Sequence, residues 1–128
     1  LKERHGQAFL IDCHSMPSTQ PGRRNLADIV LGDRFGSSCD PRLTSRIERA
    51  FRGLGLSVAR NAPYAGGYTT RRYGRPKRGF HAIQIEINRG LYMNEDAVTQ
   101  SAGFEPLQQK LSDVVTEILS VADLITSR

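Results

Sequence analysis

One histidine and one glutamate are the residues of this chain best placed to do chemistry, because each stands near the end of an apolar run. His14 ends the run 8–14, and Glu86 lies in the alternating run 80–89. An imidazole at an exposed strand end can bind a metal or act as a base, and a carboxylate can move protons. A lone histidine is more often a satisfied structural residue, so the pattern alone leaves the role of His14 open.

The run around Glu86 is the most clearly patterned stretch in the sequence. Isoleucine at every second position alternates with Gln84, Glu86 and Asn88. This period of two predicts a strand with one apolar and one polar face. An amide, a carboxylate and a second amide form an unusual polar face, which indicates a site if Glu86 reaches the carboxyl end of a strand in an open α/β sheet. The alternative is an ordinary solvated edge strand.

The neighbours of His14 divide between the two faces of its predicted strand. Asp12 shares the face of His14 and is expected to orient the imidazole or to cap a neighbouring loop. Cys13 points to the opposite face, which argues against a Cys–His nucleophile pair. Asp33 directly follows a third apolar run, where it could reach the same sheet edge, although a turn-forming or capping role is favoured over a catalytic one.

Residues 61–79 predict a single long loop rich in glycine, tyrosine and arginine. Long loops inside compact domains often serve as lids or binding loops. Gly66 and Gly67 permit a hinge or a close backbone approach, and arginines hold carboxylates well. Neither glycine-rich phosphate-binding motif occurs. A second loop is expected over residues 90–102.

The elements that would position these residues are four strands and two clear helices. The predicted strands are 8–14, 27–32, 56–60 and 80–89. One helix begins at Asp40-Pro41, an N-cap followed by proline, and another begins at residue 104. Residues 1–6 resemble the last turn of a helix ending at a glycine cap. The last helix carries an apolar stripe that predicts core packing: Leu107, Leu111, Val114, Val115, Ile118, Leu119, Ala122 and Ile125. This alternation favours an α/β domain over residues 1–128, with a mostly parallel or mixed sheet and flanking helices.

Composition narrows the function classes. The chain has 128 residues, with 18 Lys and Arg against 13 Asp and Glu, and a net charge of +5. The surplus gathers in the long loop and could meet phosphate or a small carboxylate, whereas no RNA-binding pattern surrounds it, so the sequence does not favour a nucleic-acid partner. Two cysteines without a CxxC pair suit a reducing cytoplasm. No run is long enough to cross a bilayer.

Four ordered blocks carry a family resemblance: LIDCHSMP (10–17), DIVLGD (28–33), NAPYAGGY (61–68) and QIEINRGLYM (84–93). Together they resemble the carboxyl-terminal half of the N-formylglutamate amidohydrolases. The resemblance implies a fold similar to that of the zinc carboxypeptidases. It also implies hydrolysis of N-formyl-L-glutamate, a small acidic N-acyl amino acid, to formate and L-glutamate in histidine degradation.

The same resemblance implies roles for individual residues. His14 would be a zinc ligand, and Glu86 would activate the metal-bound water and pass its proton to the leaving amine. The residues expected to border the carboxylates of the substrate are Gly66, Gly67, Tyr68 and an arginine among Arg71 and Arg72, with Arg89 as a rival.

The chain departs from the family in one respect, because nothing in it matches the amino-terminal His-Ser-Gly block and the remaining zinc ligands. We therefore expect a carboxyl-terminal part of a larger amidohydrolase domain, or a degenerate member, that binds zinc weakly or not at all. One alternative is a catalytically silent domain that contacts a partner or a second copy of itself. Others are an amidohydrolase for another N-acyl amino acid and a basic nucleic-acid-binding module.

Overall fold

The main sheet has four strands and a mixed arrangement. The computed structural model describes residues 1–23 and 25–126, with the side chains of 1–23 and 25–121. The strands are β1 Ala8–Met16, β2 Ile29–Gly32, β3 Val58–Arg60 and β4 Phe80–Asn88, in the order β1-β4-β2-β3. β1 runs parallel to β4 and β2 runs parallel to β3, whereas β2 is antiparallel to β4. The predicted mostly parallel or mixed sheet is confirmed.

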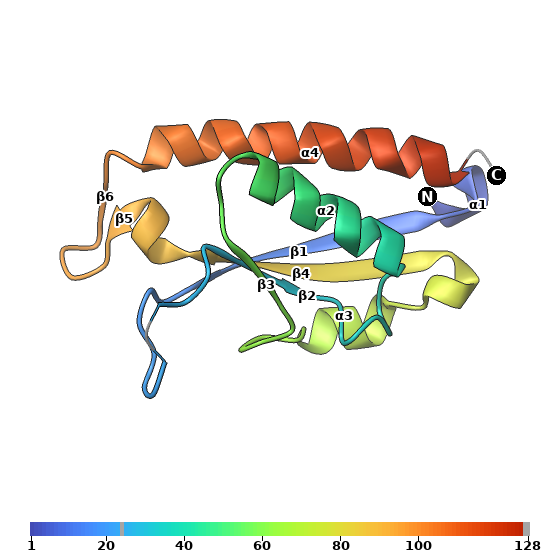
Figure 1. The fold of residues 1–128 in the computed structure, drawn as a ribbon. Helices are drawn as coiled ribbons and strands as arrows, with labels where there is room; N and C mark the ends of the chain where they lie inside the picture. The colour runs from blue at the N-terminus through green and yellow to red at the C-terminus, as the bar shows by residue number, and fades with distance from the viewer. Residues whose placement is uncertain (24, 127–128) are drawn as a thin grey trace.

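Helices cover both faces of this sheet. They are α1 Lys2–His5, α2 Pro41–Gly53, α3 Tyr68–Tyr73 and α4 Phe104–Thr126. α2 and α4 lie over one face and α3 lies on the other, which gives three layers (Figure 1). This layered α/β arrangement is the class that the alternating elements predicted. Among the described residues, no helix is both long and apolar enough to span a membrane.

The start of α2 is built as its sequence predicted. Asp40 is the N-cap, and its carboxylate accepts a hydrogen bond of 2.8 Å from the backbone N–H of Arg42. Pro41 occupies the first helical position, where its missing N–H costs nothing. Leu43, Ile47 and Phe51 then face the sheet and are almost fully buried.

The apolar stripe of α4 is only partly in the core. Leu107, Val114 and Ile118 are buried as predicted, but Val115 and Leu119 are 54% and 62% exposed. Successive helical residues point about 100° apart, so the helix turns these two away from the face that contacts α2 and the sheet. Their predicted place in the core is therefore wrong. Leu111 is half-buried, and Ala122 and Ile125 lie outside the side chains that the structure describes.

β4 is an interior strand with two covered faces, so the solvated-edge alternative is wrong. Ile83 and Ile85 join the core cluster beneath α2 and α4. Gln84 and Glu86 point to the opposite face, and each is only 5% exposed. Buried polar side chains need hydrogen-bond partners, and Gln84 and Glu86 bond to each other.

Two segments expected to be loops contain regular structure. Residues 61–79 include α3 and the short 3-10 helix η1 Pro76–Arg78, and the segment after β4 includes η2 Arg89–Leu91 and a hairpin of β5 Met93–Asn94 with β6 Thr99–Gln100. Thr70 on α3 is fully buried, and its hydroxyl donates to the carbonyl of Gly67 at 3.0 Å. One buried side chain in a six-residue helix leaves no periodic signal in the sequence.

Candidate functional site

The pairing of β1 with β4 brings the histidine and the glutamate together. His14 is directly opposite Glu86 in the parallel register, so both side chains leave the same face near the carboxyl ends of their strands. His14 Nδ1 lies 3.8 Å from Glu86 Oε1, and His14 Nε2 lies 3.0 Å from Asp12 Oδ1. The imidazole is therefore bracketed by two carboxylates, of which Asp12 is the partner that the strand pattern predicted.

The surroundings of the Glu86 carboxylate shift its pKa upwards. Burial is the main influence and raises the pKa of Glu86, and the charge of Asp12 raises it further. The positive charges of His14 and Arg89 and a hydrogen bond from Gln84 act in the opposite direction without reversing the shift. A carboxyl whose pKa is moved towards neutrality is suited to general acid–base chemistry.

Gln84 links Glu86 to the segment before α3. Its Nε2 donates to Glu86 Oε1 at 2.8 Å, and its Oε1 accepts from the backbone N–H of Gly67 at 3.0 Å. The sequence placed Gln84 on the face of Glu86 but gave it no role. The available signal was its position two residues before the carboxylate, which puts both side chains on one face of the strand.

The 61–67 loop, the segment between β3 and α3, is fixed to the end of β2. Asn61 donates to the Asp33 carboxylate at 2.9 Å, and the backbone N–H of Arg34 donates to the carbonyl of Ala65 at 2.8 Å. The guanidinium of Arg34 also donates to the carbonyl of Gly66 at 3.2 Å. The loop is therefore fixed to the end of β2 up to Gly66, and the next residue, Gly67, bonds to Gln84.

Asp33 has the structural role that its sequence position favoured. It is buried and accepts hydrogen bonds from the N–H of Gly36, the hydroxyl of Thr44 and the amide of Asn61. Because β2 is antiparallel to β4, the carboxyl end of β2 points away from the end that holds Glu86. The expectation that Asp33 could share that edge is wrong.

Two glycines allow the loop to pass close to β2. A Cβ on Gly32 would lie 2.7 Å from the carbonyl carbon of Ala65, which is closer than real contacts. Gly66 has a φ of +113°, a conformation that only glycine adopts readily, and a Cβ there would collide with the hydroxyl of Thr70. The glycine pair in the predicted loop pointed to Gly66, whereas Gly32, at the end of an apolar strand, carries no signal in the sequence.

The other predicted substrate-binding residues lie at different distances from the carboxylate. Gly67 is joined to it through Gln84, whereas Tyr68, Arg71 and Arg72 are exposed on α3. The guanidinium of Arg72 lies over the Tyr73 ring, 5.7 Å from its centroid. Among the described residues, no hydrogen bond or ion pair joins any of these three α3 side chains to Glu86.

Arg89 lies at the end of β4 that carries Glu86. It follows β4 directly, its Nε donates to the hydroxyl of Ser15 at 3.1 Å, and its charge acts on Glu86. Arg71 and Arg72 are not among the groups that mainly set the pKa of Glu86. Arg89 is therefore the candidate cation with an electrostatic influence on Glu86, although Ser15, to which it donates, faces the α4 side of the sheet.

The donor set around His14 does not fit a complete zinc centre. A catalytic zinc takes three protein ligands and keeps one open position. No group of three or more His, Cys, Asp or Glu side chains able to hold a metal occurs in the part of the chain that the structure describes. His81 lies on the other face of β4, where it stacks on Phe9 and accepts a hydrogen bond from the N–H of Asp40. His14 is thus a single candidate ligand among the described residues.

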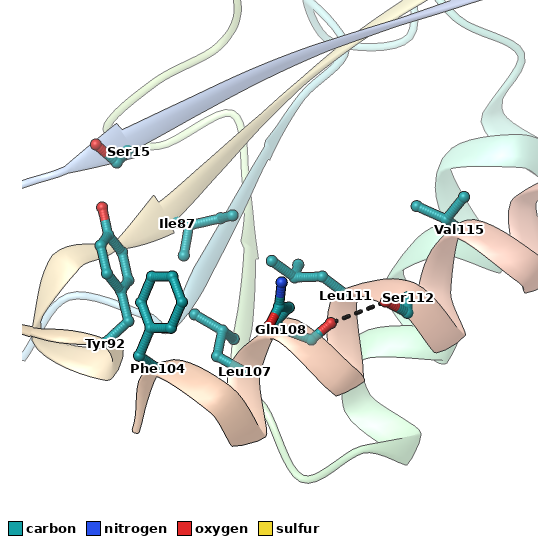
Figure 2. A pocket seen from close by; sticks show the side chains of 9 residues that line it. All are labelled: Ser15, Ile87, Tyr92, Phe104, Leu107, Gln108, Leu111, Ser112 and Val115. Atoms are coloured by element: carbon teal, nitrogen blue, oxygen red, sulfur yellow. Dashed lines mark hydrogen bonds between the residues drawn. The ribbon is translucent and has the colours of Figure 1, made fainter. Parts of the chain in front are cut away.

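Two apolar cavities lie on the α4 side of the sheet, away from His14 and Glu86. One of about 510 Å³ is lined by residues including Ser15, Tyr92 and Phe104 (Figure 2). The other, of about 630 Å³, contains Cys13 and the exposed side chain of Leu119. Neither cavity is lined by His14 or Glu86, so we do not place the candidate active site in either of them. Cys13 and Cys39 are both free thiols.

This chain is a three-layer α/β domain. A histidine and a buried carboxylate lie at the carboxyl ends of two of its parallel strands. The family model described as N-formylglutamate amidohydrolase matches residues 1–93. The chain belongs to the N-formylglutamate amidohydrolase family, as the four sequence blocks predicted.

Similar proteins agree with this assignment. The chain is 41% identical to an N-formylglutamate deformylase of Pseudomonas aeruginosa over 76% of its own length and 38% of that protein. It is 39% identical to one of Pseudomonas putida over 74% of its length and 37% of that protein. The chain therefore spans well under half the length of these curated relatives.

Two solved structures resemble this chain. An N-formylglutamate amidohydrolase from Ralstonia eutropha superposes with a TM-score of 0.82 at 38% identity, over 96% of this chain and 45% of that chain. A gene product of Agrobacterium tumefaciens gives a TM-score of 0.68 at 23% identity, over 95% of this chain and 46% of that chain. The second likeness supports the fold alone.

Proposed function

We propose that this chain provides part of the active site of an enzyme that hydrolyses the amide of N-formyl-L-glutamate to formate and L-glutamate. The observation that carries the proposal is the buried Glu86 carboxylate beside His14 at the carboxyl ends of β1 and β4. The names of the Pseudomonas relatives support the choice of substrate.

In the proposed reaction, Glu86 moves the proton that the hydrolysis requires. It accepts a proton from the attacking water as the water oxygen bonds to the formyl carbon. It then donates that proton to the amide nitrogen as the carbon–nitrogen bond breaks, so that the amine leaves in a neutral form. General acid–base assistance of this kind is typically worth about 10² to 10⁴ in rate.

The acidic substrate would be held by the basic and glycine-rich residues around the pair. We propose that Gly66, Gly67 and Tyr68 border its carboxylates and that an arginine pairs with them. Arg89 is supported by its electrostatic influence on Glu86, whereas Arg71 and Arg72 are supported by their exposure on α3 above the same face.

Zinc is the cofactor that we propose for the active enzyme, with His14 as one ligand. The described residues do not supply the three ligands of a catalytic zinc, so the remaining ligands would come from outside them. His14 suits the role because its imidazole is half exposed, with 46% of the side chain accessible, and Asp12 orients it.

A chimera tests the proposed substrate. In it, this chain replaces the stretch that it matches in the Pseudomonas aeruginosa deformylase. With zinc present, the chimera is expected to release formate from N-formyl-L-glutamate and to act much more slowly on N-formyl-L-alanine, which lacks the side-chain carboxylate. N-acetyl-L-glutamate tests the choice of acyl group.

The outcomes of this experiment separate the proposals. Equal rates on the glutamate and alanine substrates would contradict recognition of an acidic side chain, and faster release of acetate than of formate would favour a different N-acyl amino acid. A folded chimera that hydrolyses none of them would contradict the proposed function. Inactivity together with a dimer of this chain in light scattering would favour the silent interaction domain.

A further inference from the structure

Gln84 is connected to both parts of the proposed active site, although it belongs to neither. We propose that Gln84 is a positioning residue that holds the 61–67 loop and the Glu86 carboxylate in one fixed arrangement. The inference rests on the proposed function, in which Glu86 moves protons and the end of the loop borders the substrate.

The first argument is that the Gln84 amide has only one workable orientation. The backbone N–H of Gly67 is a donor and therefore requires the carbonyl oxygen of the Gln84 side chain, 3.0 Å away. The NH₂ group is then turned towards Glu86 Oε1, 2.8 Å away, where it needs an acceptor. A reversed amide would oppose two donors at Gly67 and two acceptors at Glu86. The backbone of the loop thus selects the group that faces the carboxylate.

The second argument is that both the amide and its partners are anchored. Gln84 is 5% exposed and lies on an interior strand, where its backbone is opposite Asp12 on one side and Gly32 on the other. The carbonyl of Gly67 is itself held, because it accepts from the hydroxyl of Thr70 at 3.0 Å. A movement of the loop would therefore be passed to Glu86 through two short hydrogen bonds.

The third argument concerns the chemistry that this arrangement serves. A proton carrier must stay within hydrogen-bond reach of both water and the leaving nitrogen, and misplacement by about 1 Å can cost about 10²-fold in rate. Gln84 restricts Glu86 Oε1, while the other carboxylate oxygen makes no hydrogen bond to any described group. Gln84 would therefore set the position of the carboxylate without competing for the oxygen that is free to exchange a proton.

Amide hydrogen exchange on the isotope-labelled chain tests the arrangement without any need for activity. Methionine matches glutamine in length and volume but makes neither hydrogen bond, so Gln84→Met is expected to speed exchange of the Gly67 N–H by about 10-fold or more. Thr70→Val is the matched control, because it removes a hydrogen bond from the carbonyl of the same residue and leaves the N–H bond in place. Unchanged exchange of the β2 amides would show that each variant is folded.

Kinetics of the chimera described above test the positioning role. Gln84→Met is expected to lower kcat by roughly 10- to 100-fold, as loss of a group that orients a catalytic residue typically does, and Thr70→Val is expected to lower it far less. Gln84→Asn provides a second variant if methionine prevents folding, because the shorter amide cannot reach Gly67 and Glu86 together.

Hydrogen exchange and the kinetics of the chimera test different parts of the inference. Unchanged Gly67 exchange in Gln84→Met would overturn the inference whatever the activity. An unchanged kcat in Gln84→Met, or an equal loss in Thr70→Val, would also overturn it, because Gln84 would then have no specific effect on Glu86. A wild-type chimera without formate release would contradict the proposed function, and the exchange measurement would still decide whether Gln84 fixes the loop.

Discussion

In the proposed reaction Glu86 both accepts and releases a proton, and its surroundings suit both steps. Burial raises its pKa, while His14, Gln84 and Arg89 each favour the charged form. Removing water alone would hold the carboxyl neutral, and exposing it alone would hold it charged. The influences of His14, Gln84 and Arg89 therefore keep the charged form accessible to a side chain that is almost inaccessible to solvent.

Gly66 provides a test of the loop at the scale of one residue. Gly66→Ala is expected to lower the free energy of unfolding by at least about 1 kcal/mol, because alanine is strained at positive φ and its Cβ would meet Thr70. Gly67→Ala is the control, since its φ of −96° lies outside the left-handed region and a Cβ there would be 3.5 Å from Gln84 Oε1, an ordinary contact. Urea unfolding of the two variants measures this difference, and equal stabilities would contradict the account of the loop.

Periodicity predicted part of the site at this scale and could not predict the rest. A strand alternates its side chains, so Asp12 with His14 and Gln84 with Glu86 could be assigned to common faces from the sequence. The contact of His14 with Glu86 depends on the register between strands that are far apart in the chain. That register is a product of tertiary packing and leaves no local pattern.

The orientation of α4 can be tested with two adjacent valines. Val114 is 2% exposed in the core, whereas Val115 is 54% exposed. Val114→Ala is expected to cost about 2 kcal/mol in unfolding free energy, from lost burial and the cavity left behind. Val115→Ala is expected to stay within about 0.5 kcal/mol of the wild type. A larger loss from Val115 than from Val114 would show that α4 packs with a different face.

The contact between β4 and the start of α2 predicts a pH dependence of stability. Burial lowers the pKa of His81, which as a neutral ring accepts a hydrogen bond from the N–H of Asp40. The unfolded chain therefore binds a proton at a higher pH than the folded chain. The contribution of His81 is fully present above about pH 6.5 and is lost as the pH falls through the lowered folded-state pKa.

The His81→Gln variant isolates this effect, since glutamine offers an acceptor but does not titrate. Between pH 7.5 and 5, the wild type is expected to lose more stability in urea than His81→Gln does. His5→Gln, at an exposed position, is the control and should follow the wild type. Parallel curves for the wild type and His81→Gln would contradict the proposed origin of the pH dependence.

Local signals predicted the elements better than their mutual directions. The Asp40-Pro41 cap and the alternation in β4 each specify one element from a few neighbouring residues. The antiparallel placement of β2 beside β4 has no such signal in the sequence. Because of this placement, Asp33 lies away from the sheet edge at which it was predicted. α3 was missed because Thr70 is its one buried residue, and a single buried side chain gives no helical periodicity in the sequence.

At the scale of the whole molecule, the described residues offer one imidazole beside Glu86, where a catalytic zinc needs three protein ligands. We therefore predict that this chain alone shows no tight stoichiometric zinc binding in calorimetry at neutral pH. Any weak binding should fall in His14→Ala and stay unchanged in His81→Gln. Tight binding of one zinc ion per chain would contradict the account of the donor set.

The chain spans 38% of the Pseudomonas aeruginosa deformylase, so the proposed reaction is best tested in a molecule of that protein's full length. The most direct measurement is the rate of formate release by the zinc-loaded chimera with Glu86 and with Glu86→Gln. The account predicts a fall in kcat of about 10²- to 10⁴-fold with zinc content unchanged. A Glu86→Gln chimera that turns over N-formyl-L-glutamate at the rate of its parent would contradict it.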